Sequence, residues 1–316
     1  MGFIVGDMVE LFKDLFTNRI WNLDSTKMSR VKKRMVRFIK IIRITVDTFA
    51  ENRMGFQCVS LCYFITLAII PFAAVMFAIT GGLGLTDKLM PILYSTTLPS
   101  DMIDMLFEKA SNIINVAKSG VVGLVSALMF LWTILWLMFQ VERVFNNVWG
   151  IRKVPRKIYK RFSFYFLVII LSPFLVLLFG TGIAYYTNVT KLIGLDLGDL
   201  NFLPKLLGWA GFYIVTAFTL SVMYKFIPAA KVKYRFALKS ALIAALVFAG
   251  FQYLYLETQV FVNRLNTVYG AIAAIPLFLI WLNFSWQIII YGAELTYSYQ
   301  HVDSYHIPEW EPEEKK

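Results

Sequence analysis

The chain has 316 residues, of which 58% are hydrophobic and 16% are charged, whereas an ordinary soluble domain carries about 25% charged residues. Its two Cys residues are too few for a disulfide-stapled scaffold, and its net charge is +11. Because the apolar residues are concentrated in long runs, we expect a membrane-embedded protein and not a soluble domain.

Residues 1–53 form a basic segment that contains eleven Lys and Arg. Apolar side chains recur within 26–50 at helical spacing, at Val31, Met35, Phe38, Ile42, Val46 and Phe49. Basic side chains occupy much of the remaining surface, at Lys27, Arg30, Lys33, Arg34, Arg37 and Lys40. Such a helix either lies on an anionic cytoplasmic leaflet, where each basic residue contributes about 1 kcal/mol, or packs as a solvated helix on cytoplasmic loops.

Six stretches are long enough to cross a bilayer, which requires about 20 apolar residues. They lie near 54–80, 120–139, 162–186, 203–226, 237–256 and 271–295. Because lipid offers no partner for backbone polar groups, these spans should be helices. The sequence therefore predicts an all-α class, a polytopic membrane helical bundle of six transmembrane helices over 54–298 with additional amphipathic interfacial helices. Since the first span follows a long basic segment, we expect no cleavable signal peptide.

Some residues inside these spans affect helix geometry and packing. Proline interrupts three spans, removes a backbone donor from each and is expected to bend them, at Pro71, Pro173 and Pro276. Alanines recur every four residues from Ala241 to Ala249, which creates a face of small side chains and allows close helix approach.

Basic residues alternate in density between successive connections, which predicts the orientation of the chain. The counts of Lys and Arg are seven in 140–161 and four in 225–236, against three in 82–119 and one each in 187–202 and 257–270. Both termini should therefore be cytoplasmic. The net charge is then explained by topological anchors, and we expect no nucleic-acid partner.

The outer loop 82–119 contains an amphipathic stretch, 101–118, with Ser100 as a candidate N-cap. This helix either caps the bundle on its external side or contacts an envelope protein partner. The segment 299–316 is polar and is expected to be a cytoplasmic tail.

A polar stripe runs along the last span, where Asn283, Gln287 and Glu294 recur at four and seven residues. Glu294 lies about 23 residues into the span, or roughly 35 Å, against a hydrocarbon core of about 30 Å, so it should lie near the cytoplasmic interface. Glu142 ends the second span at the same depth. The stripe either pairs with a basic loop to hold helix ends in register or forms an inner gate of a pathway; both interpretations require a cationic partner for Glu294.

The chain offers little for catalysis. His301 and His306 are five residues apart, which is not the spacing of a helical zinc pair, and Cys58 and Cys62 suit apolar packing in the first span. We find no nucleophile elbow and no phosphate-binding glycine loop. We therefore expect no enzyme activity, no cofactor and no metal site.

Four stretches resemble the YihY/BrkB family of bacterial inner-membrane proteins. They are "VSLCYFITLAIIPF" (59–72), "VFNNVWGIRK" (144–153), "YKFIPAAKVKYRFALKSALIAALVF" (224–248), and "VYGAIAAIPLFLIW" (268–281) followed by "YGAE" (291–294). The residues that match by motif are Tyr63, Pro71, Trp149, Gly150, Pro228, Tyr269, Gly270, Pro276, Gly292 and Glu294.

The resemblance implies a six-span protein of the bacterial cytoplasmic membrane. Members of the family were once labelled ribonuclease BN, but this chain lacks a metal cluster and a soluble domain that could hold tRNA, so we do not expect a ribonuclease. Other members have been linked to serum resistance, ion transport and envelope lipid movement. The sequence favours passage of a hydrophobic or amphipathic solute such as a lipid; the alternatives are a secondary ion transporter or a membrane scaffold that binds envelope partners through 82–119.

Overall fold

The computed structural model describes residues 29–82, 100–117, 121–151, 202–263 and 267–304, together with Met90, Tyr94, Tyr159 and Tyr165. Every regular element within these residues is a helix, which confirms the predicted all-α class. The helices are α2 (Arg30–Glu51), α3 (Met54–Gly82), α5 (Ser100–Ala117), α6 (Val121–Val148), α8 (Phe202–Phe226), α9 (Tyr234–Asn263) and α10 (Thr267–His301).

Five of the six predicted spans coincide with helices among the described residues, namely α3, α6, α8, α9 and α10. The remaining prediction, 162–186, lies outside the described residues except for Tyr165. Three stretches of the described chain are long and apolar enough to cross a membrane: Met54–Val75, Tyr234–Tyr255 and Pro276–His301. The helical membrane domain is thus supported, while the number six stays a prediction.

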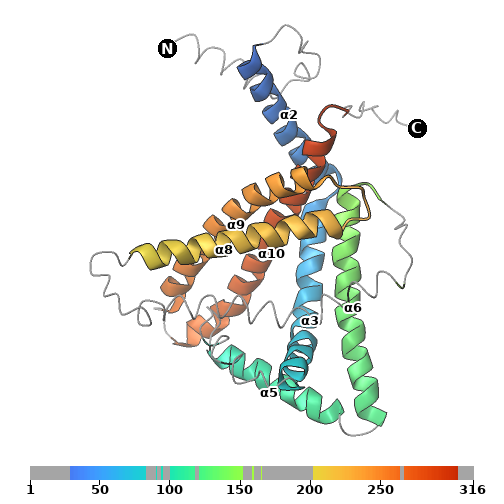
Figure 1. Ribbon diagram of the computed structural model, residues 1–316. Helices are drawn as coiled ribbons and strands as arrows, with labels where there is room; N and C mark the ends of the chain where they lie inside the picture. The colour runs from blue at the N-terminus through green and yellow to red at the C-terminus, as the bar shows by residue number, and fades with distance from the viewer. Residues whose placement is uncertain are drawn as a thin grey trace, which may run out of the picture.

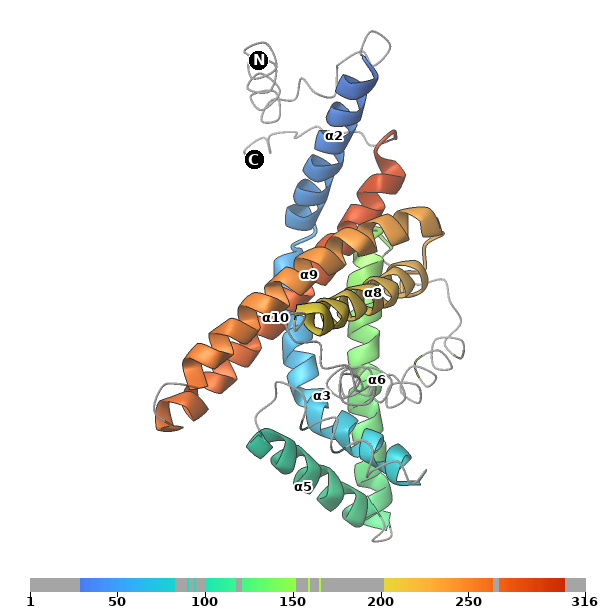
Figure 2. The same cartoon turned by 60° about the vertical axis from the view of Figure 1, so that its left-hand side comes forward.

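The helices form two groups that meet near the C-terminal end of α2 and diverge away from it (Figures 1 and 2). One group contains α3, α5 and α6, and the other contains α8, α9 and α10. Helix α5 packs against α3 and α6 at the end remote from α2. This position fits the predicted cap on the bundle, while an envelope partner for 82–119 stays a prediction.

The core lies where the two groups meet. Met54 of α3, Phe145 of α6 and Tyr224 of α8 are almost fully buried there. Small side chains of α9, including Ala241 and Ala245, belong to the same buried cluster, so the predicted small-residue face does serve close helix packing.

Helix α2 packs along the C-terminal part of α10 (Figure 2). Ile41 and Ile44 of α2 form a buried cluster with Val302, just beyond α10. Five of the six residues predicted to form the apolar face point away from this contact and are exposed, namely Val31, Met35, Phe38, Ile42 and Val46. Helix α2 therefore has two apolar surfaces: one meets protein, and the second, which we call the open stripe, meets none of the described chain over much of its area.

Candidate functional site

The predicted polar stripe of α10 lies along the contact with α3. Asn283 donates its Nδ2 to Sγ of Cys62 at 3.9 Å, and Gln287 donates Nε2 to Oδ1 of Asn283 at 2.6 Å. Both amides are half-buried. Asn283 thus binds a neighbouring helix, as polar residues inside a bundle commonly do, and Gln287 binds Asn283 within α10.

Glu294 is fully buried, with 0% of its surface exposed. Asn52 donates Nδ2 to Oε1 of Glu294 at 3.5 Å, and the hydroxyl of Thr48 also approaches the carboxyl group. Oε2 of Glu294 has no hydrogen-bond partner among the described residues. Asn52 lies two residues before α3, so Glu294 lies level with the start of that helix; its position at the cytoplasmic interface stays a prediction.

The cationic partner predicted for Glu294 does not appear among the described residues, whose ion pairs are Arg37 with Asp303 and Arg43 with Asp47. The physical reason is the docking of α2. Its last two turns place Thr48 and Asn52 against the carboxyl group, so neutral donors occupy the space that a basic loop was expected to fill.

A row of polar contacts continues from Glu294 along the boundary between α2 and α10. Thr45 lies 2.9 Å from the hydroxyl of Ser298, which donates to the backbone carbonyl of Glu294 at 2.9 Å. At the exposed end, Arg37 Nη2 lies 2.8 Å from Asp303 Oδ2. These contacts fix the position of α2 along α10.

Glu142 is also buried, and it accepts a hydrogen bond from the hydroxyl of Tyr165. One turn later on α6, Asn146 accepts a hydrogen bond through Oδ1 from the backbone N–H of Ala229 at 2.7 Å. This bond ties the end of α6 to the connection between α8 and α9. Asn146 was not singled out by the sequence analysis, because its partner is 83 residues away.

Several motif residues shape the same end of the bundle. Gly150 has φ +64°, a left-handed conformation that ends α6 and favours glycine. Trp149 packs edge-on against Tyr297 and His301 of α10, with ring centroids 5.5 Å apart in each pair. Pro228 is buried in the connection after α8.

The other motif residues lie farther from this end. Tyr63 is exposed on α3, and Pro71 and Pro276 lie inside α3 and α10. Tyr269 and Gly270 fall in the first turns of α10. Their backbone is helical, so α10 begins four residues before the predicted start of the last span at residue 271.

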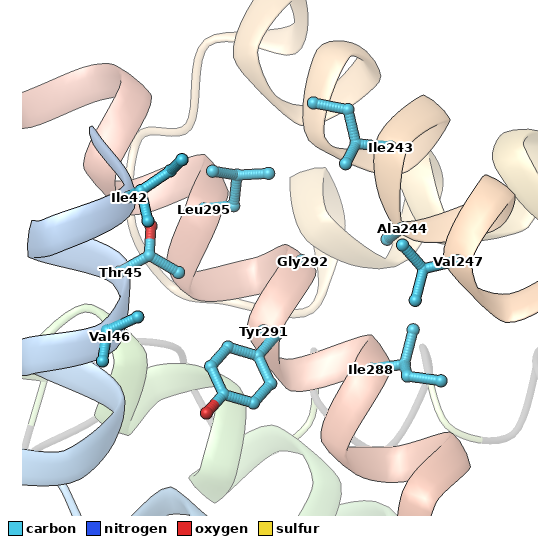
Figure 3. A pocket seen from close by; sticks show the side chains of 10 residues that line it. All are labelled: Ile42, Thr45, Val46, Ile243, Ala244, Val247, Ile288, Tyr291, Gly292 and Leu295. Carbon is cyan, nitrogen blue, oxygen red and sulfur yellow. The ribbon is translucent and has the colours of Figure 1, made fainter. Parts of the chain in front are cut away.

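An apolar groove lies between α2, α9 and α10 (Figure 3). Its volume is about 290 Å³. The lining residues are Ile42, Thr45, Val46, Ile243, Ala244, Val247, Ile288, Tyr291, Gly292 and Leu295. Only Thr45 and Tyr291 carry a polar side-chain atom, and Thr45 is already engaged with Ser298.

Aromatic contacts join α10 to the other two helices of the groove. Phe49 of α2 stacks on Tyr291 with ring centroids 3.8 Å apart, and Phe236 of α9 stacks on Tyr299 of α10 at 6.4 Å. Periodicity alone identified Ile42 and Val46 as apolar surface. It could not show that α9 and α10 complete a groove with them, because that depends on how three helices far apart in sequence pack.

Among the residues that the structure describes, no group of three His, Cys, Asp or Glu side chains could hold a metal ion. The polar stripe and the groove occupy neighbouring faces of α10: Asn283 contacts α3 and Glu294 contacts the end of α2, while Ile288 and Leu295 line the groove. The chemistry available at the groove is therefore burial of apolar groups.

Comparisons with known proteins agree with this picture of a membrane protein. The profile of the family described as "Virulence factor BrkB" matches residues 45–316. A "UPF0761 membrane protein" of Chromohalobacter salexigens is 28% identical over 75% of the chain, and the chain spans 57% of its length. Relatives with the same description from Haemophilus influenzae and Coxiella burnetii are 27% and 28% identical over 78% of the chain, covering 90% and 87% of their lengths. No solved structure gives a significant match.

Proposed function

We propose, from the premise that this chain belongs to the virulence factor BrkB family of membrane proteins, that it passes a hydrophobic or amphipathic solute through or along the bacterial inner membrane. Both termini would face the cytoplasm, as the distribution of Lys and Arg predicts. The proposed activity is transport without a chemical step, so we expect neither enzyme nor ribonuclease activity.

The observation that carries the proposal is the groove between α2, α9 and α10. Its lining is almost entirely apolar, and α9 and α10 each contain one of the stretches that could cross a membrane. A ligand pocket usually combines an apolar lining with a few polar groups that fix orientation. A groove of this composition suits a hydrocarbon chain better than an ion or a sugar.

The proposal is tested with purified protein reconstituted into phosphatidylcholine vesicles that contain a trace of fluorescent, NBD-labelled phospholipid. Dithionite bleaches the label in the outer leaflet, so the rate at which the remaining signal disappears measures transbilayer movement. We expect faster movement than in protein-free vesicles, and slower movement for Ile288→Trp, which fills the groove. Leu246→Trp is the matched control, because Leu246 is exposed on α9 and does not line the groove.

Wild-type protein that inserts correctly yet leaves the rate at the protein-free value would contradict passage of phospholipids. So would equal rates for Ile288→Trp and wild type, because the groove would then take no part in movement.

A second candidate, secondary ion transport, is favoured by one observation: Glu142 and Glu294 are both buried carboxyl groups. Intramembrane carboxyl groups commonly mark ion pathways. Here an ion flux in vesicles that is abolished by Glu294→Gln, with unchanged expression and folding, would support this candidate. A third candidate, a scaffold for envelope partners, predicts co-purification that is lost when 95–118 is deleted.

A further inference from the structure

Two rows of side chains lead into the apolar groove, and each begins with a basic residue. On α9, Lys239 is followed at four-residue spacing by Ile243 and Val247. On α2, Arg34 is followed at the same spacing by Phe38 and Ile42. Side chains four residues apart on a helix are neighbours on one face, so in both helices a cation is in line with the apolar lining.

Both cations are available to a ligand. Arg34 and Lys239 are exposed, and neither forms an ion pair with a carboxylate among the described residues. Two other basic side chains of α2 do pair with carboxylates, since Arg37 pairs with Asp303 and Arg43 pairs with Asp47.

The direction of the two rows is the same. Helices α2 and α9 both run away from the end of the bundle at which α2 begins and α10 ends (Figures 1 and 2). The cations therefore lie toward that end, which the Lys and Arg distribution predicts to be cytoplasmic. The apolar lining lies deeper, toward Ile288 and Tyr291 (Figure 3).

We propose that this groove binds one acyl chain of an anionic phospholipid from the cytoplasmic leaflet, with the phosphate directed toward Lys239 and Arg34. Such a lipid has its negative charge at the cytoplasmic surface and its chains pointing inward, which matches the groove in both charge and direction. The volume of about 290 Å³ is at the small end for ligand pockets, roughly 300–1,000 Å³, and suits part of one chain.

The open stripe of α2 extends this surface. Phe38, Ile42 and Val46 are exposed beside the groove, so the second chain of the lipid can lie against them while the first is held between the helices. This inference rests on the proposed function, which supplies a hydrophobic or amphipathic solute. The inference adds that this solute is an anionic phospholipid.

The test is native mass spectrometry of the full-length protein in detergent, titrated with dioleoyl phosphatidylglycerol or with dioleoyl phosphatidylcholine. We expect wild-type protein to retain the anionic lipid preferentially. The double variant Arg34→Gln with Lys239→Gln should lose about fivefold in phosphatidylglycerol binding per charge removed, with phosphatidylcholine binding unchanged. Lys109→Gln, an exposed lysine on α5, is the matched charge control.

A second pair of variants tests the groove itself. Val247→Trp should reduce binding of both lipids, whereas Leu246→Trp, on the exposed surface next to it, should not. Because Val247 is about half exposed, the larger side chain can be accommodated without disrupting the core, and thermal unfolding of both variants verifies this.

The inference is overturned when wild-type protein retains the two lipids equally, or when Val247→Trp and Leu246→Trp bind lipid equally. It is also overturned when the groove is occupied by another part of the protein or by a second copy. A dimer that Val247→Trp abolishes would identify a second copy of the chain as the occupant, and a several-fold rise in lipid binding on deletion of 1–28 would identify that segment. Lipid binding that follows these expectations without transbilayer movement in vesicles would instead contradict only the proposed function.

Discussion

Gly292 determines how closely α10 approaches α8 and α9. A Cβ atom at this position would lie 2.1 Å from Oη of Tyr224 and 2.8 Å from Cβ of Ala244. Tyr224 cannot easily yield, because its hydroxyl donates to the carbonyl of Ile289 at 2.9 Å. We expect Gly292→Ala to lower the free energy of unfolding by about 1–3 kcal/mol, measured as a lower midpoint of thermal unfolding in detergent.

Gly250→Ala is the matched control, since a Cβ atom there would meet nothing within 4 Å. It should stabilise α9 by up to about 1 kcal/mol, because alanine favours helix more than glycine does. Adding Tyr224→Phe to Gly292→Ala removes the closest contact and should restore part of the loss. Equal effects of the two single alanine variants would show that Gly292 is not a close contact.

Asn146 carries the link between α6 and the connection that follows α8. Asn146→Ala leaves the partly buried N–H of Ala229 without its acceptor, so we expect a loss of about 1–3 kcal/mol in unfolding free energy. Asn147→Ala, at the neighbouring and partly exposed position, should cost less than half as much. The two variants are compared by thermal unfolding at equal expression, and equal losses would contradict the role of Asn146.

The buried environment of Glu294 predicts that a negative charge introduced at position 52 lowers the stability of the protein. Asn52→Asp would place a second carboxyl group where the amide donor now lies, 3.5 Å from Oε1, and should be destabilising by more than 1 kcal/mol. Glu294→Gln keeps the shape of the side chain and should cost less, because its present partners are neutral. Thermal unfolding separates these outcomes, and a larger loss for Glu294→Gln would indicate a cationic partner after all.

At the scale of single elements, the sequence predicted where helices occur better than what their faces contact. The period of apolar residues located α2, but the stripe from Val31 to Val46 is largely exposed, whereas Ile41 and Ile44 meet α10. Periodicity identifies an apolar surface without saying whether lipid or protein covers it. The partner of Glu294 was missed for the same reason: Asn52 is 242 residues away along the chain.

The open stripe of α2 leads to a prediction about its surroundings. A spin label on Phe38→Cys, in protein reconstituted into vesicles containing phosphatidylglycerol, should be more accessible to oxygen than to a water-soluble nickel chelate. A label on Lys33→Cys, which lies on another side of the helix, should show the reverse. The native cysteines, Cys58 and Cys62, are both buried, so labelling should be confined to the introduced thiol.

High accessibility of both labels to the nickel chelate would favour the alternative of a solvated helix. The six basic residues predicted to contact an anionic leaflet would then act only as topological anchors. Agreement with the prediction would instead show that the open stripe of α2 contacts the hydrocarbon of the leaflet while its basic face meets water, as expected for an amphipathic helix with a basic polar face.

At the scale of the whole molecule, hydropathy predicted which segments form the long helices, but local sequence patterns could not predict how those helices pack against each other. The spans predicted at 203–226, 237–256 and 271–295 each fall within a helix, since lipid imposes length and composition directly on the sequence. The division into two diverging groups depends on contacts such as Gly292 with Tyr224, which join residues with no pattern in common.

The connectivity of the helices predicts one further crossing. Helices α6 and α8 end on the same side of the bundle, because Asn146, near the end of α6, binds the N–H of Ala229, just after α8. The chain leaves α6 on that side, whereas α8 begins at Phe202, which is on the opposite side when α8 crosses the membrane as its sequence predicts. We therefore expect the apolar stretch 162–186 to cross the membrane. Together with the five other predicted spans, this crossing would give an even number and would place both termini on one side.

Reporter fusions test this topology in the native membrane. An alkaline phosphatase fused after Asp196 should be active, since that site would be external, whereas fusions after Lys233 and Lys316 should be inactive and the matching fluorescent-protein fusions bright. An active phosphatase after Lys316 would mean an odd number of crossings, and 162–186 would then lie on one side of the membrane. In that case the basic loops would no longer assign the end that carries Arg34 and Lys239 to the cytoplasm, so the same experiment tests the orientation on which the lipid site depends.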